Sequence, residues 1–448
     1  MNIYLHVEVS LRELDSKLLL GVIAASKGHQ VLISDISDIE RGFRRGILNP
    51  GIFHTKSITP SDKKISFHKK LIDKKFLVTS IDEEAGLELI NPQFEELYIS
   101  RSSKKTIKQS AAIFCWGNDD FKIFNKIYPK DKSKIIKTGS PRVDLWNSIF
   151  LNYWGIPTKK PKKPFLLISS NMALSNGIQK FPEVIRMHKE LGYFERNPQM
   201  FNELFEQQAE DAIKSSDFIR AIKHLAYNNN KFDIVFRPHP TEDIDTWKFY
   251  LGGIPNVHVI REGSITAWVN NAFAVMHNGC TTALEASVIG KPVITYLPSK
   301  RKYKNNFPNK LGFRINSLKR LSDKVNLLFK NFKSQKKSLK KKKIPKFISQ
   351  KIYFDNNELA SNKIIKEWEK LYNNNLHLPT NWKKLYFLLK VTSIRNKFKN
   401  RNKNWKFPPL NKNDINERVK KIKHALNIKQ KIDCKIISER AVLIKKNI

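Results

Sequence analysis

The 448-residue sequence contains few cysteines, few acidic residues and no long apolar run. Its three cysteines, Cys115, Cys280 and Cys434, lie far apart and form no Cys-x-x-Cys pair. This spacing excludes a disulfide framework and a cysteine-ligated zinc site. The absence of 18 consecutive apolar residues excludes a transmembrane helix, and the apolar stretch at 18–25 follows acidic residues, which a signal peptide avoids. We therefore expect a cytoplasmic protein.

Acidic residues are outnumbered two to one, with 41 Asp and Glu against 82 Lys and Arg, giving a net charge of +41. After residue 330 the imbalance grows to 32 basic residues against 8 acidic ones. Basic clusters at 340–343 and 395–406 are suited to anionic lipid, so we expect this tail to hold the protein at the inner face of the plasma membrane. Two alternatives are binding to nucleic acid, for which no module signature is present, and a solvated surface enriched in Lys and Asn by composition alone.

The apolar residues present are sufficient for a large core and follow an alternating strand and helix pattern. In the first 150 residues short strand patterns occur at 3–9, 30–34, 76–79, 111–115 and 134–138. After a Lys- and Pro-rich linker at 158–164 they resume at 165–169, 232–236, 257–260, 272–276 and 292–296. Strands that alternate with helices are typical of parallel sheets with crossover helices.

The sequence therefore predicts an α/β fold with two Rossmann-like, doubly wound domains facing a cleft, followed by a basic helical extension. The expected parts are an acceptor-side domain at 1–157, a nucleotide-binding domain at 165–330, a basic connector and helix at 331–375, and a basic C-terminal extension at 376–448. Ligands of such sheets bind at the carboxyl ends of the strands, so polar residues there are the candidates for chemistry.

The first candidate is Arg-Pro-His-Pro at 237–240, directly after a predicted strand. The two prolines restrict the backbone and so fix the turn. Arg237 offers a two-pronged donor to phosphate or carboxylate, and His239 offers a second donor. The alternative is a structural turn in which the histidine caps a neighbouring carbonyl.

The second candidate is the segment 275–294, which has the pattern strand, short turn, helix, turn, strand. Its possible ligand-binding residues are Asn278, Gly279, Thr281, Thr282 and Glu285. The threonines stand at the expected helix start, where free N–H groups and the helix dipole favour an anion. Such a pair is often only a helix cap, but together with the Arg-Pro-His-Pro motif it predicts a site for a nucleotide phosphate.

The third candidate is an acidic loop, Asp82-Glu83-Glu84-Ala85-Gly86, after a predicted strand in the first half. A carboxylate there could act as a general base for an attacking hydroxyl, or as a nucleophile. The alternative is a solvated acidic loop. Three adjacent acids lack the ligand spacing of a divalent-ion site, so no metal and no bound cofactor are predicted.

Two further segments place polar residues near the expected cleft. Arg12 and Glu13 follow the first strand, and Ser140 and Arg142 belong to a Gly-Ser-Pro-Arg turn after another. Arg142 could reach a substrate anion or form a local salt bridge with Asp144.

The ordered set of motifs resembles the bacterial surface carbohydrate biosynthesis protein family over roughly residues 1–330. The matching segments are Arg-Glu-Leu-Asp at 12–15, Asp-Glu-Glu-Ala-Gly at 82–86, Gly-Ser-Pro-Arg at 139–142 with Asp144, Arg-Pro-His-Pro at 237–240, and His-Asn-Gly-Cys-Thr-Thr-Ala-Leu-Glu-Ala at 277–286. More distantly, the chain is similar to GT-B glycosyltransferases, including bacterial sialyltransferases, capsule Kdo transferases and CDP-glycerol glycerophosphotransferases. This resemblance implies that Glu83 or Glu84 is the catalytic carboxylate, and that His239 with Thr281 and Thr282 holds the nucleotide. The sequence departs from the distant pattern in having Ala85 before Gly86 and Thr-Thr in place of Ser-Ser.

The expected function is transfer of a sugar from a nucleotide-activated donor, a CMP-linked acidic sugar being one candidate, to a surface polysaccharide or lipopolysaccharide acceptor. The rival expectations are a nucleotide-sugar epimerase or a glycerophosphotransferase of similar fold, and a nucleic-acid-binding protein driven by the basic tail.

Overall fold

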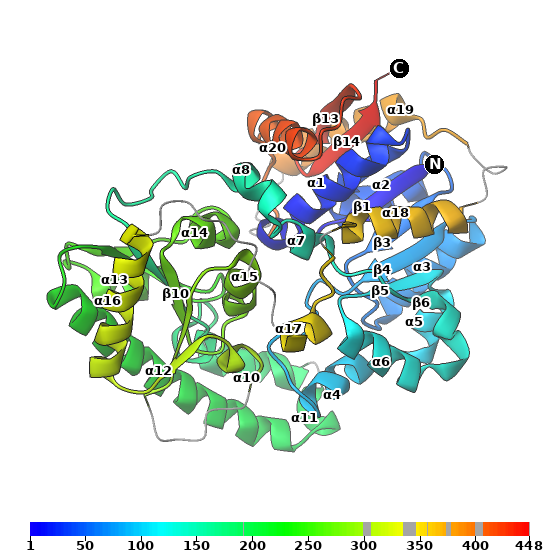
Figure 1. The fold of residues 1–448 in the computed structure, drawn as a ribbon. Helices are drawn as coiled ribbons and strands as arrows, with labels where there is room; N and C mark the ends of the chain where they lie inside the picture. The colour runs from blue at the N-terminus through cyan, green and yellow to red at the C-terminus, as the bar shows by residue number, and fades with distance from the viewer. Residues whose placement is uncertain are drawn as a thin grey trace. The chain divides into compact units, whose positions relative to one another are not determined.

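The computed structural model describes residues 1–190, 192–298, 306–334, 346–355, 357–372, 378–398 and 406–447. The chain divides into two compact units (Figure 1). Unit 1 comprises residues 1–86, 91–153 and 345–448, and unit 2 comprises residues 87–90 and 154–344. The basic cluster at 340–343 lies outside the described residues, as do residues 399–405 of the cluster at 395–406.

Unit 1 is built on an eight-stranded sheet in the order β13-β14-β2-β1-β3-β4-β5-β6. The strands are β1 (Asn2–His6), β2 (Gln30–Ser34), β3 (Ile52–Thr55), β4 (Leu77–Ile81), β5 (Ala112–Cys115), β6 (Ile135–Lys137), β13 (Ile432–Ser438) and β14 (Ala441–Lys446). The first six run parallel, whereas β14 is antiparallel to both β2 and β13. The chain passes from β1 to β2 on one side and returns to β3 on the other, which makes β1 and β3 the topological switch point of this sheet.

Helices cover this sheet, and α1 (Ser10–Ser26) is buried along most of its length, with an apolar stretch at 18–25 and buried charged residues before it. The others are α2 (Ile36–Arg44), α3 (Asp62–Asp73), α4 (Gln93–Ser100), α5 (Lys104–Gln109), α6 (Asn118–Ile127), α7 (Pro141–Asp144), α8 (Leu151–Trp154), α17 (Lys346–Lys351), α18 (Ala360–Leu371), α19 (Trp382–Phe398) and α20 (Lys412–Ala425), with 3-10 turns η1 (Pro129–Lys134) and η2 (Ser148–Phe150).

Unit 2 contains a six-stranded parallel sheet in the order β12-β11-β10-β7-β8-β9. Its strands are β7 (Phe165–Ser169), β8 (Asp233–Arg237), β9 (Val257–Val259), β10 (Ala274–His277), β11 (Val293–Tyr296) and β12 (Phe313–Ile315). Its helices are α9 (Ala173–Asn176), α10 (Phe181–Glu190), α11 (Tyr193–Arg196), α12 (Gln199–Tyr227), α13 (Ile244–Leu251), α14 (Ile265–Asn271), α15 (Thr282–Ile289) and α16 (Leu318–Ser334), with η3 (Pro308–Lys310). This is the strand order of a Rossmann sheet, with its switch point between β7 and β10.

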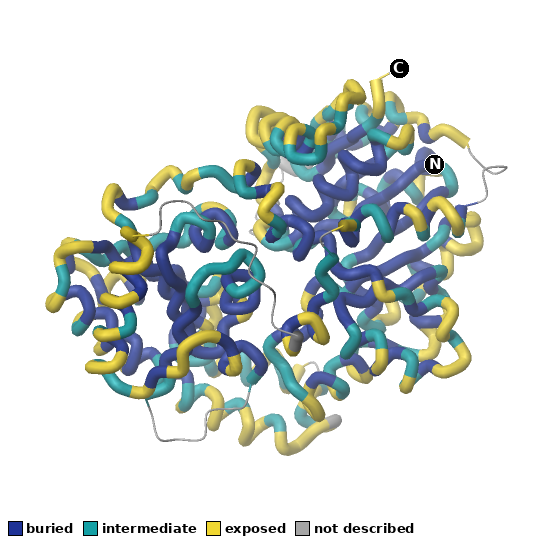
Figure 2. Tube along the Cα trace, viewed as in Figure 1, coloured by how far each residue is buried: buried dark blue, intermediate teal, exposed yellow. Residues whose placement is uncertain are grey.

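Each sheet is the centre of its own unit's core. Figure 2 shows the strands as buried tubes in both units. In unit 2 the core joins residues of β7, β8 and β10 to the inner faces of α12 and α16. In unit 1 one part of the core joins β1, β3 and β4 to α19 and β14. The expected fold class, two Rossmann-like doubly wound α/β sheets, is confirmed.

The C-terminal segment contains helices, as expected, namely α19 and α20, but it also contains two strands that were not predicted. Residues 432–446 form β13 and β14, and β14 pairs with β2 from Ala441↔Ser34 to Ile444↔Val31. The described part of 376–448 therefore completes the sheet of unit 1 instead of forming a separate part. Two other strands, β3 and β12, were not predicted because each is only a few residues long and lacks a distinct apolar alternation. Among the described residues, no helix is both long and apolar enough to cross a membrane.

Candidate active site

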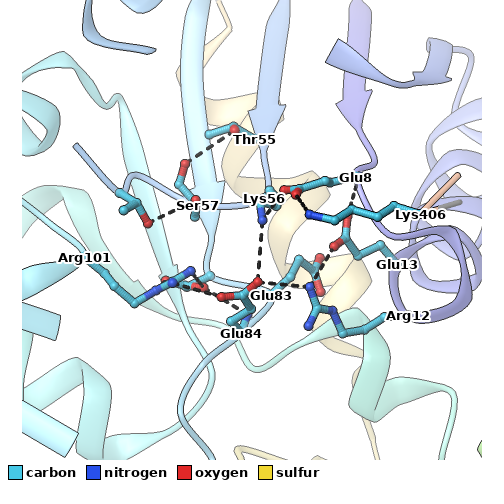
Figure 3. A network of polar contacts seen from close by, with 12 residues as sticks. Glu8, Arg12, Glu13, Thr55, Lys56, Ser57, Glu83, Glu84, Arg101 and Lys406 are labelled. Atoms are coloured by element: carbon cyan, nitrogen blue, oxygen red, sulfur yellow. Dashed lines mark hydrogen bonds and ion pairs between the residues drawn. The ribbon is translucent and has the colours of Figure 1, made fainter. Parts of the chain in front are cut away.

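The carboxyl edge of the unit 1 sheet carries a dense network of charged side chains at its switch point (Figure 3). Glu8 follows β1, Lys56 follows β3, and the acidic loop 82–84 follows β4. Because parallel strands present their carboxyl ends at one edge, the three segments meet there. A hydrogen bond from the Glu83 amide to the Lys56 carbonyl, 2.9 Å long, joins the second and third segments directly.

Glu83 forms a buried ion pair with Lys17, which α1 presents four residues after Glu13. The Nζ of Lys17 lies 2.6 Å from Oε1 of Glu83, and the two side chains are 0% and 1% exposed. The other carboxylate oxygen of Glu83, Oε2, accepts no hydrogen bond from any described residue. Burying two charged side chains is costly unless they pair closely, and the contact between Lys17 and Glu83 meets that requirement.

Glu84 is the accessible acid of the loop, with a side chain that is 40% exposed. Its carboxylate lies 3.2 Å from Arg12 Nη2, 2.9 Å from Arg101 Nη1 and 3.6 Å from Lys56 Nζ. Partial burial opposes ionisation, but Lys56, Arg101 and Arg12 outweigh it and hold the pKa of Glu84 below its ordinary value. Glu84 is therefore held as an ionised carboxylate, the form that can accept a proton, stabilise positive charge or attack as a nucleophile.

Three neighbouring side chains, those of Arg101, Trp116 and Arg142, hold the acidic loop in place. Arg101 binds the Asp82 carboxylate with two hydrogen bonds, of 2.7 and 2.9 Å. The indole Nε1 of Trp116 donates to the Asp82 carbonyl at 2.7 Å, and Arg142 Nη1 donates to the Glu83 carbonyl at 3.1 Å. These contacts hold Asp82 and its loop in place, and the grouping of Asp82 with the possible catalytic acids stays a prediction.

Glu13 is a further buried acid beside this loop. It accepts hydrogen bonds from the Glu8 amide at 2.8 Å and from Arg12 Nη2 at 3.3 Å. Burial, and then the charge of Glu83, raise the pKa of Glu13 above its ordinary value. The environments of these carboxyl groups thus differ, and they shift the pKa values of Glu13 and Glu84 in opposite directions.

A lysine from the C-terminal segment completes the network. Lys406 Nζ lies 3.1 Å from Oε1 of Glu8, and Lys56 forms an ion pair with the other oxygen of the same carboxylate. The Lys406 carbonyl accepts a hydrogen bond from the Ser10 amide at 2.8 Å, at the start of α1. Residues almost 400 positions apart in the chain therefore share one site.

Of the sequence candidates in unit 1, the structure brings Arg12, Glu13, Glu83, Glu84 and Arg142 together. Ser140 lies buried at the N-cap of α7, where its hydroxyl accepts the Arg142 amide, 3.2 Å away. The predicted alternative of an Arg142–Asp144 salt bridge is wrong. Asp144 instead accepts the amides of Ala360 and Ser361, each at 2.8 Å, and so caps α18.

Unit 2 places its candidates at the carboxyl ends of β8 and β10. Arg237 is 7% exposed and donates to the carbonyls of Glu262 at 2.6 Å and Gly263 at 2.9 Å. Its guanidinium also lies 5.3 Å from the ring centroid of Trp268, and burial lowers its pKa to about 10. Arg237 thus fixes the loop before α14, and no described contact joins it to Thr281 or Thr282. His239 is half-buried and its Nδ1 lies 2.7 Å from the Thr241 hydroxyl.

The turn between β10 and α15 contains a buried amide without a partner. Asn278 is 3% exposed, and both its side-chain nitrogen and oxygen lack a hydrogen bond to any described residue. Gly279 follows with φ of +80°, a conformation that favours glycine, and its amide donates to Asn309 Oδ1 at 2.8 Å. Buried polar side chains are nearly always satisfied in proteins, so this amide beside a helix N-terminus is a candidate ligand-binding group.

The predicted helix start at the threonine pair agrees with the structure. Thr281 is the exposed N-cap of α15 and makes no side-chain cap, while Thr282 is buried with its hydroxyl 3.2 Å from Cys280 Sγ. Glu285 is buried one turn into the helix. Within the described ranges, His, Cys, Asp and Glu side chains form no cluster of three that could hold a metal ion.

Sequence reasoning missed the cations of the unit 1 site, namely Lys17, Lys56, Lys64, Arg101 and Lys406. One signal was available: Lys17 is the last charged residue before the apolar stretch of α1 and follows Glu13 by four residues. Lys56 depended on β3, which was not predicted. Nothing in the local pattern around Arg101 or Lys406 indicates that either reaches the acidic loop.

Comparisons with known proteins give structural similarities only. No family model matches the chain, and no curated protein is similar to it in sequence. A Listeria monocytogenes protein assigned as a UDP-N-acetylglucosamine 2-epimerase is 14% identical, with a TM-score of 0.48 over 83% of this chain and 97% of that one. The UDP-GlcNAc 2-epimerase from Neisseria meningitidis is 14% identical, with a TM-score of 0.43 over 83% and 100%. The wall teichoic acid polymerase TagF is 11% identical, with a TM-score of 0.47 over 82% and 88%. At these TM-scores and identities, the similarities do not favour one activity over another.

Proposed function

We propose that the chain is a GT-B-like glycosyltransferase that transfers a sugar from a nucleotide-activated donor to a surface polysaccharide or lipopolysaccharide acceptor. The observation that carries this proposal is the pairing of two kinds of site on two Rossmann-like sheets. Unit 1 has an ordered acid and base network at its switch point, and unit 2 has an unsatisfied amide and a helix N-terminus at its own. In this proposal unit 2 binds the nucleotide and unit 1 provides the catalytic carboxylate.

The donor site would use the turn between β10 and α15. Asn278 would form hydrogen bonds with the nucleotide, and the free amides at the start of α15, with the hydroxyls of Thr281 and Thr282, would bind its phosphate. These donors stabilise the phosphate more strongly as negative charge develops on it, which lowers the barrier to its departure. His239 is the additional candidate on the neighbouring strand end.

The transfer step requires one carboxylate, which accepts the proton of the acceptor hydroxyl. The acceptor oxygen forms a bond to the anomeric carbon, and its proton passes to a carboxylate of unit 1. The bond from the anomeric carbon to the phosphate oxygen breaks, and its electron pair leaves with the nucleotide. Glu83 and Glu84 are the candidates for this carboxylate, and in a two-step route the ionised Glu84 would attack the carbon itself.

Thermal-shift measurements with CMP, CDP, UDP and GDP test the donor site, since a ligand that binds the folded state raises its melting temperature. Turnover assays then separate the activities. Nucleotide release that requires an acceptor glycan supports transfer, whereas epimerised nucleotide sugar without an acceptor, or turnover of CDP-glycerol, would assign the rival enzyme activities. Tight binding of duplex DNA, with no thermal shift from any nucleotide, would contradict the proposal and indicate a nucleic-acid-binding protein.

Asn278→Leu should separate ligand binding from stability. Because the buried amide has no partner, we expect the variant to melt at the wild-type temperature or above it without ligand. Its nucleotide affinity should fall roughly 10- to 100-fold, the cost of one or two lost hydrogen bonds. Asn309→Leu is the matched control, since that amide does have a partner, the Gly279 N–H. The control should be destabilised without ligand. If Asn278→Leu binds nucleotide as tightly as the wild type, Asn278 has no role in the donor site.

The membrane partner is proposed from the exposed face of α19. This face carries Lys383, Lys384, Lys390 and Phe387, with Phe387 70% exposed, while Leu385 and Leu389 on the opposite face are buried in unit 1. A helix face that places lysines around an exposed aromatic ring is suited to an anionic lipid surface.

Reversing the charge at Lys383, Lys384 and Lys390 to Glu should abolish binding to vesicles that contain phosphatidylglycerol. Each lysine contributes about 1 kcal/mol near such a surface, and repulsion adds to the loss. Sedimentation with vesicles measures the effect. Reversal of Lys63, Lys69 and Lys70 on α3 is the control and should reduce binding less. Equal losses in both variants would indicate a response to net charge alone.

A further inference from the structure

Lys64 on α3 differs from the other cations around the acidic loop in having no carboxylate partner. Arg12, Lys17, Lys56, Arg101 and Lys406 each form at least one ion pair with an acid of the network. Lys64 forms none with any described residue. Its Nζ donates instead to the Ser57 carbonyl at 3.2 Å and to the Ser57 hydroxyl at 3.0 Å. A second hydroxyl, that of Thr59, lies 3.4 Å from Ser57 Oγ.

The surroundings of Lys64 disfavour its charge. Burial, followed by the charge of Lys56, lowers the pKa of Lys64 to about 8, and the more distant Asp82 and Glu8 do not compensate. A lysine held in this way, beside a second lysine and two hydroxyl groups, would be stabilised by an anion. Lysine acts toward phosphate as a point charge, and hydroxyl groups add directional donors to the same oxygens.

Lys64, Ser57 and Thr59 lie close to the acidic loop, because Lys56 connects them to it. Lys56, which precedes Ser57, contacts both Glu8 and Glu84, and its carbonyl accepts the Glu83 amide. An anion bound by Lys64 and Thr59 would therefore lie next to the loop that provides the proposed catalytic carboxylate. This is the unit 1 side of the reaction, which the proposed function assigns to the acceptor.

We propose that Lys64 and Thr59, both partly exposed and both held by the buried Ser57 hydroxyl, form a subsite for an oxyanion, a phosphate monoester or carboxylate group, on the acceptor substrate. The assignment to an acceptor rests on the proposed function, but the anion subsite itself does not. It would orient an acidic acceptor so that its hydroxyl meets the carboxylates at 83–84, and it would discriminate against neutral glycans. Lys64 would be a specificity-determining residue in direct contact with the substrate.

Competitive labelling of lysines on the full-length protein tests the subsite. An amine-reactive acetylating reagent is applied in chloride, inorganic phosphate or acetate at equal ionic strength, and the labelled sites are identified by peptide mass spectrometry. Inorganic phosphate should slow labelling of Lys64 several-fold and leave Lys63, the exposed neighbouring lysine, unchanged. Protection by phosphate alone assigns a phosphate group, and protection by acetate assigns a carboxylate. Equal labelling of Lys64 in all three salts, or equal protection of both lysines, would overturn the proposal.

A second measurement separates this inference from the donor site. Lys64→Gln should lose the stabilisation by phosphate that remains in Lys63→Gln, while both variants keep the wild-type thermal shift with the preferred nucleotide. If no nucleotide stabilises any of these proteins but phosphate still protects Lys64, the proposed function fails and the anion subsite stands. If nucleotides bind and phosphate has no effect on Lys64, the subsite fails alone.

Discussion

Deletion of residues 406–448 should unfold unit 1 rather than release an otherwise intact enzyme from the membrane. The deletion removes β14, whose Ala441, Val442 and Ile444 are fully buried and pair along β2. It also removes two ion pairs, one between Lys406 and Glu8 and one between Arg418 and Asp15 on α1, the latter 2.7 Å long. An apolar inner strand would become an exposed edge, which promotes aggregation.

The expected result is insoluble expression or loss of the cooperative melting transition of unit 1. Circular dichroism and calorimetry on the soluble fraction measure it. Deletion of residues 447–448 alone is the control and should melt as the wild type does, because it leaves β13 and β14 intact. A deletion protein that retained the full-length melting temperature would mean that the C-terminal strands contribute nothing to folding. Because unit 1 depends on this segment, loss of membrane binding in such a deletion cannot be assigned to the tail; the charge reversals on α19 avoid that difficulty.

Replacement of Lys17 by Met should cost about 3–5 kcal/mol of stability, because it leaves the Glu83 carboxylate buried without its counter-charge. The double variant Lys17→Met/Glu83→Leu should recover most of this loss, since an apolar pair of similar volume often replaces a buried ion pair at little cost. Chemical denaturation of the single and double variants measures both values. Lys27→Met removes a partly exposed ion pair with Glu369 and should change stability by only about 0–1 kcal/mol.

The same variants separate the structural role of Glu83 from its catalytic one. If Glu83 is the catalytic carboxylate, the double variant should be stable and inactive in acceptor-dependent nucleotide release, while Glu84→Gln retains measurable turnover. If the double variant is both stable and active, Glu83 serves only to anchor the loop, and Glu84 becomes the remaining candidate. A double variant as unstable as Lys17→Met would contradict the ion-pair explanation itself.

The polar residues that follow strands were the most predictable part of the candidate site. Arg12, Glu13, Glu83 and Glu84 were selected because ligands of open α/β sheets bind at carboxyl edges, and the structure brings them together at one edge. Arg237 was selected by the same reasoning, but this reasoning did not predict its role in holding a neighbouring loop. A guanidinium at a strand end can bind a ligand or a neighbouring loop, and only the position of the carbonyls at 262–263 decides between the two.

The sequence by itself determined that the chain forms two parallel α/β sheets and that charged residues gather where their strands end. Both follow from short-range patterns, since apolar runs of a few residues make strands and parallel strands align their ends. The tertiary structure decided which cation neutralises which carboxylate, that Asp144 caps a helix more than 200 residues later in the chain, and that the basic C-terminal segment supplies two strands and Lys406. These contacts join residues hundreds of positions apart. They depend on which groups become buried together, and no local sequence pattern contains that information.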